Sequence, residues 1–261
     1  MQDRYAADYG DFSKCGLLRR LSGSDLCVGL NWYLTDNESH NQDGRHIDYL
    51  SPPHRHFQSL LSCDPDLFRN LQKLITRGTR SVKALQTMDI WPQHTRFYEK
   101  RLNYQKRTPS ERKTHRQQWL NQAIQTLKGV DLICLDPDNG LAVPSVSTTH
   151  SLGVKYATLY EVSAFWDTGA SLVIYQHVSR RSGAHQQAEA RLTQLRSVLS
   201  GVQALHAIRF HRGTSRLYLI AMQLQHTSRL SKRISQMFRT PWKDHFSYAC
   251  PSWKGTTTSP Y

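Results

Sequence analysis

Hydrophobic runs of two kinds divide the chain into expected strands and helices. Three runs are apolar without alternation and have the length of strands, namely residues 26–34, 130–135 and 171–176. Such runs are typical of strands that are buried on both faces, as in parallel sheets. Two further apolar segments, 205–211 and 216–222, are joined by Arg-Gly-Thr-Ser and are expected to form an antiparallel hairpin.

Helices are expected between these strands, where hydrophobic positions recur every three or four residues. One helix is expected to start at Asp64, because Pro65 follows at the first helical position. Another is expected after Thr108, because Thr108 and Glu111 have the spacing of a capping box. Further helices are predicted at 11–23, capped by Asp11 or Ser13, at 184–200 and at 228–239.

Strands separated by helices predict an α/β fold, a three-layer sandwich with a mainly parallel central sheet and a C-terminal antiparallel hairpin. We expect one catalytic domain over residues 1–250, with basic helical segments at 64–128 and 228–240, and a loose tail at 251–261. No apolar run reaches the ~20 residues of a membrane span, so no membrane partner is expected. The N-terminus lacks a signal-peptide pattern, and the 5 scattered cysteines favour a reducing, cytoplasmic setting. The oligomeric state stays open.

The net charge of +14 is unevenly distributed along the chain. Residues 69–116 carry 13 Lys and Arg against 3 Asp and Glu, and residues 179–243 carry 12 against 1. Residues 1–68 carry 6 against 10, and residues 117–178 carry 2 against 5. Because so basic a surface repels itself unless an anion covers it, we expect a polyanion such as DNA as partner. The expected nucleic-acid contacts are Arg45, Arg180, Arg181, Arg212, Arg229, Lys232 and Arg233.

Polar side chains follow the ends of three predicted strands. The strand at 130–135 runs into Asp136-Pro137-Asp138-Asn139-Gly140, and the strand at 171–176 runs into His177. Since ligands of such sheets bind beyond the carboxyl ends of the strands, we expect a site at this edge. The expected catalytic residues are Asp136, Asp138, Asn139 and His177. The expected substrate contacts are Asp36, Asp43, Trp32, Tyr33, Tyr175, Gln176 and Ser179. For any single one of these residues, a turn or core role is the alternative.

Several reaction classes lack their sequence signals. The chain has no G-x-x-x-x-G-K-[ST] motif and no strand followed by a glycine-rich turn, which disfavours NTP hydrolysis and dinucleotide binding. A metal-dependent nuclease stays open, because Asp136 and Asp138 with Asp36 or Glu38 have the oxygen ligands that magnesium prefers. The acid–x–lysine arrangement of many such sites is missing there, and no zinc spacing is present. No metal and no cofactor is expected.

Residues 175–183 resemble the histidine motif of the uracil-DNA glycosylase superfamily. His177 matches the histidine and Ser179 the serine of that motif, with Val178 in place of a proline. Asp136 is similar to the acid of the family's water-activating motif, and Asn139 to its base-reading amide. Asp36 or Asp43 is the alternative for the acid, since the family places it after an early strand. The resemblance implies an α/β fold with its site at the strand ends and cleavage of an N-glycosidic bond.

A second resemblance is to class I methyltransferases. The order of elements is similar: a first strand, a later strand ending in Leu135-Asp136-Pro137-Asp138-Asn139-Gly140, a strand at 171–177, a helix and a terminal hairpin. Asp136 and the three residues after it look like a variant of the acid-Pro-Pro-aromatic motif of the amino-methyltransferases that act on nucleic acid. The first strand lacks the glycine-rich turn of that family.

The leading expectation is a monofunctional DNA glycosylase. Cleavage of an N-glycosidic bond develops positive charge on the sugar and negative charge on the base, which a carboxylate and a histidine or amide can stabilise without a cofactor. The base must be flipped out of the duplex, and the basic segments would hold the phosphates meanwhile. A modified base, such as a hypermodified phage base, would suit this mixture of motifs and a role in anti-phage defence. A methyltransferase-like enzyme, a metal-dependent nuclease and a non-catalytic nucleic-acid-binding module are the alternatives.

Overall fold

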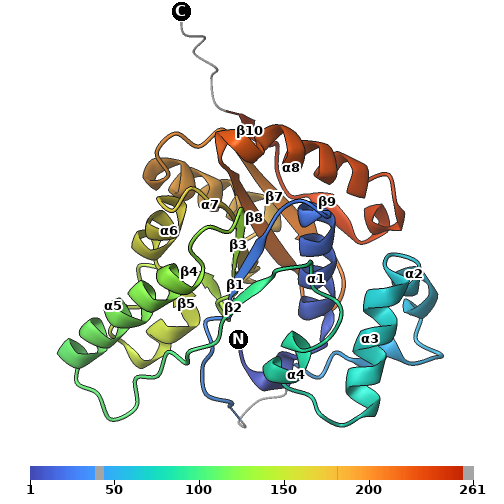
Figure 1. The fold of residues 1–261 in the computed structure, drawn as a ribbon, viewed down its shortest axis with the longest axis horizontal. Coiled ribbons are helices and arrows are strands. Elements are labelled where there is room, and N and C mark those ends of the chain that lie inside the picture. Colours follow the sequence, from blue (N-terminus) through green and yellow to red (C-terminus); the bar gives the residue numbers. More distant parts are fainter. Residues whose placement is uncertain (39–43, 181, 255–261) are drawn as a thin grey trace, which may run out of the picture.

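The computed structural model describes residues 1–38, 44–180 and 182–254. Within these residues the chain forms a central sheet with helices on both faces (Figure 1). The helices are α1 (Tyr9–Ser22), α2 (Phe57–Leu61), α3 (Pro65–Thr76), α4 (Val82–Gln86), α5 (Pro109–Thr126), α6 (Leu159–Trp166), α7 (Ala184–Val198) and α8 (Leu224–Met237). Short 3-10 helices lie at Asp3–Tyr5, Asp48–Leu50, Ser151–Lys155 and Pro241–Asp244.

The strands are β1 (Val28–Asn31), β2 (Arg96–Tyr98), β3 (Leu132–Leu135), β6 (Ser171–His177), β7 (Ala204–Phe210), β8 (Arg216–Met222), β9 (Phe246–Tyr248) and β10 (Trp253–Lys254). The order across the sheet is β10-β7-β8-β6-β3-β1-β2, and β9 also pairs with β7. Strands β2, β1, β3 and β6 are parallel. A separate two-stranded pair joins β4 (Gly140–Leu141) to β5 (Tyr156–Ala157).

The α/β class and the C-terminal hairpin are confirmed, but the expectation of a mainly parallel sheet is wrong. Strand β8 is antiparallel to both β6 and β7, and β9 and β10 are antiparallel to β7. The reason is local: the five-residue connection 211–215 is too short for a crossover, so the chain must turn back beside β7. The returning strand then fills the place between β7 and β6, and the sheet is mixed.

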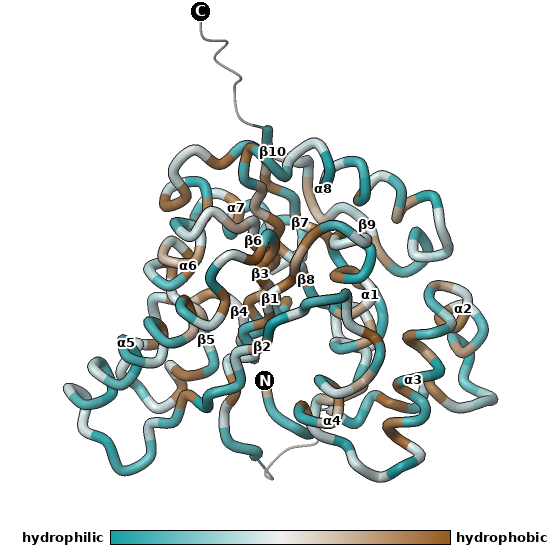
Figure 2. Tube along the Cα trace, in the orientation of Figure 1, coloured by the Kyte–Doolittle hydropathy of each residue, from teal (hydrophilic) through white to brown (hydrophobic). Residues whose placement is uncertain are grey.

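Each central strand contributes to two hydrophobic cores, one on each face of the sheet. In β3, Leu132 and Cys134 pack with α1, α3 and α8, whereas Ile133 and Leu135 pack with α5, α6 and α7. This explains why the strand is apolar without alternation. The two groups of helices lie on opposite sides of the sheet in Figure 1, and Figure 2 shows the hydrophobic residues concentrated along the strands between them.

Two of the predicted helix starts follow the capping chemistry of the sequence, and two other helices begin earlier than predicted. The Thr108 capping box of α5 and the Asp64 cap of α3 are both present. Helix α1, however, starts earlier than predicted, because Asp8 rather than Asp11 or Ser13 accepts the exposed backbone N–H of the first turn. This earlier start leaves the side chain of Asp11 available for other contacts. Helix α8 likewise begins at Leu224 rather than at residue 228.

The predicted tail 251–261 begins with structure, since Trp253–Lys254 forms β10 against β7. The rest of that tail, residues 255–261, lies outside the described residues. In the described part of the chain, no helix has the length and apolar character to cross a membrane.

Candidate functional site

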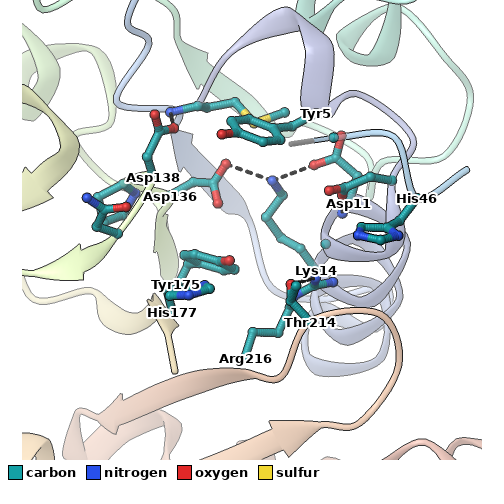
Figure 3. Close-up of a pocket in the computed structure, with 16 residues that line it drawn as sticks. Tyr5, Asp11, Lys14, His46, Asp136, Asp138, Tyr175, His177, Thr214 and Arg216 are labelled. Carbon is teal, nitrogen blue, oxygen red and sulfur yellow. Dashed lines mark hydrogen bonds and ion pairs between the residues drawn. The ribbon is translucent and has the colours of Figure 1, made fainter. Parts of the chain in front are cut away.

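A cavity of about 250 Å³ lies beyond the carboxyl ends of β3 and β6. We call it the strand-end cavity; the start of α1 and the start of β8 complete its walls (Figure 3). This is the edge of the sheet at which the sequence predicts a site. The polar residues that line it are Tyr5, Asp8, Asp11, Lys14, His46, Asp136, Asp138, Asn139, Tyr175, His177, Thr214 and Arg216.

A buried lysine joins two carboxylates at one wall of the cavity. Lys14 Nζ lies 2.7 Å from Asp11 Oδ1 and 2.7 Å from Asp136 Oδ2. Asp11 and Lys14 are three residues apart on α1 and therefore share a helix face, while Asp136 directly follows β3. The indole of Trp32 lies beneath the ammonium, with its ring centre 4.7 Å from Nζ. Figure 3 shows Lys14 reaching between the two carboxylates.

The charges of this triad do not cancel. Burial alone would lower the pKa of Lys14, but Asp11 and Asp136 outweigh burial, raise this pKa well above its ordinary value and keep the ammonium charged. Burial raises the pKa of Asp136 and of Asp11, although Lys14 opposes the shift at both. One cation thus serves two carboxylates, and the wall favours one more proton or a positive charge on a ligand.

The neighbouring carboxylate, Asp138, is held by the start of the chain. Its Oδ1 lies 2.5 Å from the amino group of Met1, and its Oδ2 accepts a hydrogen bond from Gln2 Nε2 at 3.0 Å. The Met1 amino group also donates to the carbonyl oxygen of Tyr33 at 2.9 Å. Asp138 therefore lines the cavity with both of its oxygens already engaged.

Arg216 forms the opposite wall and is almost completely buried, at 2% exposure. Its Nη2 donates to Thr214 Oγ1 at 2.8 Å, and Tyr175 is a further polar neighbour of the guanidinium, but Nε and Nη1 meet no acceptor in good hydrogen-bond geometry among the described residues. Burial would lower the pKa of Arg216, but Tyr175 and Asp8 outweigh it, so the pKa is raised and the guanidinium is charged. Because buried donors without partners are costly, these two nitrogens are suited to bind an acceptor on a ligand.

His177 stands beside Arg216 because of the sheet register. The two residues are directly paired across the antiparallel strands β6 and β8, and both lie below the lysine triad in Figure 3. Tyr175, two residues before His177, points to the same side of the sheet, and burial raises its pKa to about 12. The result is a cavity with a net negative wall at α1 and β3 and a positive wall at β8.

The structure brings together five of the predicted site residues. Asp136, Asp138 and Asn139 come from the end of β3, and Tyr175 and His177 come from the end of β6. Gln176 points to the other face of the sheet, where its side chain bonds the backbone of Asn139, Leu141 and His177.

Other predicted substrate contacts do not line the cavity. Trp32 and Tyr33 are fully buried, and the Tyr33 hydroxyl donates to Glu161. Asp36 accepts hydrogen bonds from Asn103 and Gln105. The backbone of Ser179 is bonded by the Gln187 side chain. Asp43 lies outside the described residues, as does Arg181 of the predicted nucleic-acid contacts.

The predicted nucleic-acid contacts fall in different places. Arg45 is exposed beside His46 of the strand-end cavity, Arg180 is exposed after β6, and Arg212 lines a second cavity next to the first. On α8, Arg229 and Arg233 pair with Asp25, and Lys232 is exposed. Asp25 precedes β1, so this part of α8 lies near the edge of the sheet opposite the cavity.

Sequence reasoning missed the residues that complete the site, namely Asp8, Asp11, Lys14, Thr214 and Arg216. A signal for the first three was present: they recur every third residue in a segment whose other positions are largely apolar. Charged groups at helical spacing on an apolar helix suggest a buried polar cluster. Arg216 had no such signal, because its burial depends on β8 running between β6 and β7.

The arrangement offers little to a metal ion. In the described ranges, no three His, Cys, Asp or Glu side chains are placed to hold a metal. Asp11 and Asp136 already share the ammonium of Lys14.

Comparison of the sequence with known protein families and with curated proteins gives no match to either.

Proposed function

We propose that the protein hydrolyses the N-glycosidic bond of a single nucleotide in DNA, as a monofunctional glycosylase. The observation that carries this proposal is the opposed charge of the two cavity walls. Asp136 lies in a wall with more carboxylates than cations, and Arg216 and His177 lie in the other wall. A reaction that separates positive charge on a sugar from negative charge on a base is stabilised by such a pair of walls.

Each wall has a role in this reaction. As the bond between C1′ and the base nitrogen breaks, its electron pair stays on the base, and the sugar becomes cationic. Asp136 stabilises the sugar cation and orients a water molecule, whose oxygen bonds to C1′ while its proton passes to the carboxylate. The raised pKa of Asp136 suits a group that must accept a proton near neutral pH. Arg216 Nε and Nη1 donate to the departing base.

The size of the cavity and the charge of the protein fit a base delivered from nucleic acid. A volume of about 250 Å³ is small for a drug-sized ligand and suits a single flipped nucleotide base. The net charge of +14 favours attachment to phosphates around that base. A modified base is the proposed substrate, as the mixture of motifs implies, and anti-phage defence is the proposed setting.

The test is mass spectrometry of small molecules released from DNA that carries uracil, alkylated bases, or hydroxymethylated or glucosylated cytosine, with no metal or cofactor added. The parent is expected to release one free base, and Asp136→Asn is expected to release it at least about a hundredfold more slowly. Asp167→Asn is the matched control, because Asp167 is an exposed carboxylate at the end of α6. An equal slowing of base release in both variants would contradict a role for Asp136.

One observation favours a second candidate, a methyltransferase-like enzyme. Strands β1, β3 and β6 are parallel neighbours and the hairpin β7–β8 follows them, which is the order of elements behind that resemblance. The residues after β1 do not fit the implied S-adenosylmethionine, however, because Trp32 and Tyr33 are fully buried where that family has a glycine-rich turn. Transfer of label from S-adenosylmethionine to DNA, without base release, would replace the glycosylase proposal by this one.

A further inference from the structure

A second cavity of about 250 Å³ lies beside the strand-end cavity. We call it the histidine–arginine cleft, and its histidine and arginine side chains are His46, His54, Arg55, His56, His211 and Arg212. The two cavities are neighbours, because His46 lines both and because Gly213 of the cleft directly precedes Thr214 of the strand-end cavity. A ligand in one cavity is therefore within reach of the other.

The cleft gathers positive charge with little to balance it. Arg55 and Arg212 are permanently charged, and Asp48 is the one carboxylate among the described residues that line the cleft. Asp48 Oδ2 lies 3.4 Å from His54 Nε2, and the Asp48 side chain is 66% exposed, so water screens its charge. Two guanidinium groups thus face one weakly held counter-charge.

Two hydrogen bonds to the protein fix the guanidinium of Arg212 in place. Its Nε donates to His245 Nδ1 at 2.9 Å, and its Nη2 donates to the carbonyl oxygen of Asp244 at 2.8 Å. Two of the three guanidinium nitrogens are thereby fixed by the segment that follows α8. A cation that is fixed before the ligand arrives loses less conformational entropy on binding.

The positive charge of the cleft also lowers the pKa of two of its histidines. Burial lowers the pKa of His56, and Arg212 and Arg55 lower it further. Burial also lowers the pKa of His211, with Arg209 and Arg212 adding to the shift. An anion in the cleft would oppose these effects and would accept hydrogen bonds from the imidazoles as well as from the arginines.

We propose that the histidine–arginine cleft binds a phosphate group of the nucleic acid, adjacent to the nucleotide held in the strand-end cavity. Phosphate fits because its oxygens accept several charge-assisted hydrogen bonds at once, and arginine binds it in a bidentate manner. The assignment of this phosphate to nucleic acid rests on the proposed function. The cleft's suitability for phosphate depends only on the residues that line it.

The first measurement is the affinity for a short fluorescein-labelled single-stranded oligonucleotide, by fluorescence anisotropy over a series of salt concentrations. Arg55→Gln is expected to weaken binding about tenfold and to reduce the slope of log K against log salt by about 0.7, the value for one lost contact on a single strand. Arg55 is exposed, so this variant is expected to fold. Adding His56→Gln is expected to weaken binding further.

Arg196→Gln is the matched control, because Arg196 is an exposed arginine far from the cleft. It lies near the end of α7, and the chain then enters β7 at the opposite edge of the sheet. Equal weakening in Arg55→Gln and Arg196→Gln, or no weakening in either, would overturn the proposal. Free phosphate is the other ligand that could occupy the cleft, and its binding is measured as broadening of the ³¹P resonance of inorganic phosphate. Broadening that needs Arg55, with oligonucleotide binding independent of Arg55, would overturn the assignment to nucleic acid.

Binding and base release are separable in this design. The two measurements probe different residues, because Arg55 and Arg212 line the cleft whereas Asp136 lines the strand-end cavity. Binding that depends on Arg55, in a protein that releases no base, would refute the glycosylase and leave the cleft as a phosphate site. Base release with no dependence of binding on Arg55 would refute the cleft alone.

Discussion

Lys14 is the residue on which the geometry of the candidate site depends most. Its ammonium is buried and is the shared partner of Asp11 and Asp136. Lys14→Met is expected to lower the free energy of unfolding by about 3–5 kcal/mol, because it leaves two carboxylates buried without a counter-ion. Urea denaturation of parent and variant at neutral pH measures this loss.

Lys83→Met is the control for that experiment, because the Lys83 side chain is 72% exposed and its ammonium lies 3.4 Å from Glu99. The loss there is expected to stay below about 1 kcal/mol, as for other exposed pairs. The double variant Lys14→Met with Asp136→Asn is expected to recover part of the stability. Similar losses for Lys14→Met and Lys83→Met would mean that water reaches the triad.

Single residues show which parts of the site a sequence can predict. Asp136, Asn139 and His177 could be found because they follow the ends of apolar runs within four residues, and the ends of parallel strands meet at one edge. Gln176 was predicted to contact the substrate, but its side chain does not line the cavity. Side chains of a strand alternate between faces, and His177, the next residue, is on the cavity side. Lys14 depends on a contact with a segment more than a hundred residues away, and Arg216 depends on the pairing of β8 with β6; no local pattern records either.

At the scale of elements, local chemistry predicted the helix starts better than the sheet. The Thr108 capping box and the Asp64 cap need only neighbouring residues, and both are present. The direction of β8 depends instead on the length of the preceding connection and on the space left between β6 and β7. The hairpin was predictable, but its insertion into the sheet was not.

Helix α1 makes a close contact that a single methyl group can test. A Cβ atom on Gly16 would lie 2.3 Å from Cη2 of Trp242, which is fully buried. Gly16→Ala is therefore expected to destabilise the protein by about 1–3 kcal/mol, although alanine is the better helix former. The measurement is the midpoint of thermal unfolding.

Gly183→Ala provides the comparison, because Gly183 has a φ of −62° and no atom within 4 Å of an added Cβ. That variant is expected to change stability by less than about 1 kcal/mol, because the stiffer unfolded chain offsets the weaker N-cap that alanine makes. If Gly16→Ala were as stable as Gly183→Ala, the contact between α1 and Trp242 would have to be looser than the structure indicates.

Helix α8 offers a test of what its basic residues do. Arg233 Nη1 donates to the carbonyl oxygens of Leu21 and Ser22, and Arg233 also pairs with Asp25. Arg233→Gln is therefore expected to cost about 1–3 kcal/mol of stability, because two carbonyl groups lose a charged donor. Urea denaturation measures the cost, and oligonucleotide affinity is expected to change less than twofold. A large loss of oligonucleotide affinity in a variant that is still stable would show that α8 contacts the nucleic acid.

For the whole molecule, the alternation of acidic and basic blocks along the chain becomes an arrangement in space. The acidic blocks contribute Asp8, Asp11, Asp136 and Asp138 to the strand-end cavity. The basic block 179–243 contributes Arg212 and Arg216 to the two neighbouring cavities, but its α8 residues lie elsewhere. The charge counts indicated which segments are basic, whereas the choice of individual arginines required the fold.

The stability of the whole molecule is expected to depend on pH through its buried histidines. Burial lowers the pKa of His206 to about 4 and that of His245 to about 4. Between pH 6.5 and 4 the unfolded chain binds protons that these folded-state imidazoles do not, so each contributes stability that is fully present above pH 6.5 and is lost as the pH falls. Each contributes a slope of up to about 1.4 kcal/mol per pH unit.

Comparison of the parent with His206→Gln isolates one such contribution. Other groups also contribute, and the raised pKa values of Asp11 and Asp136 give a contribution of the opposite sign. Because they titrate alike in both proteins, they cancel in the difference. Urea denaturation at several pH values is expected to give His206→Gln a shallower loss of stability below pH 6.5, whatever its stability at neutral pH. Parallel curves would show that His206 takes up its proton while the protein stays folded, and so that water reaches this imidazole between β7 and Ser252.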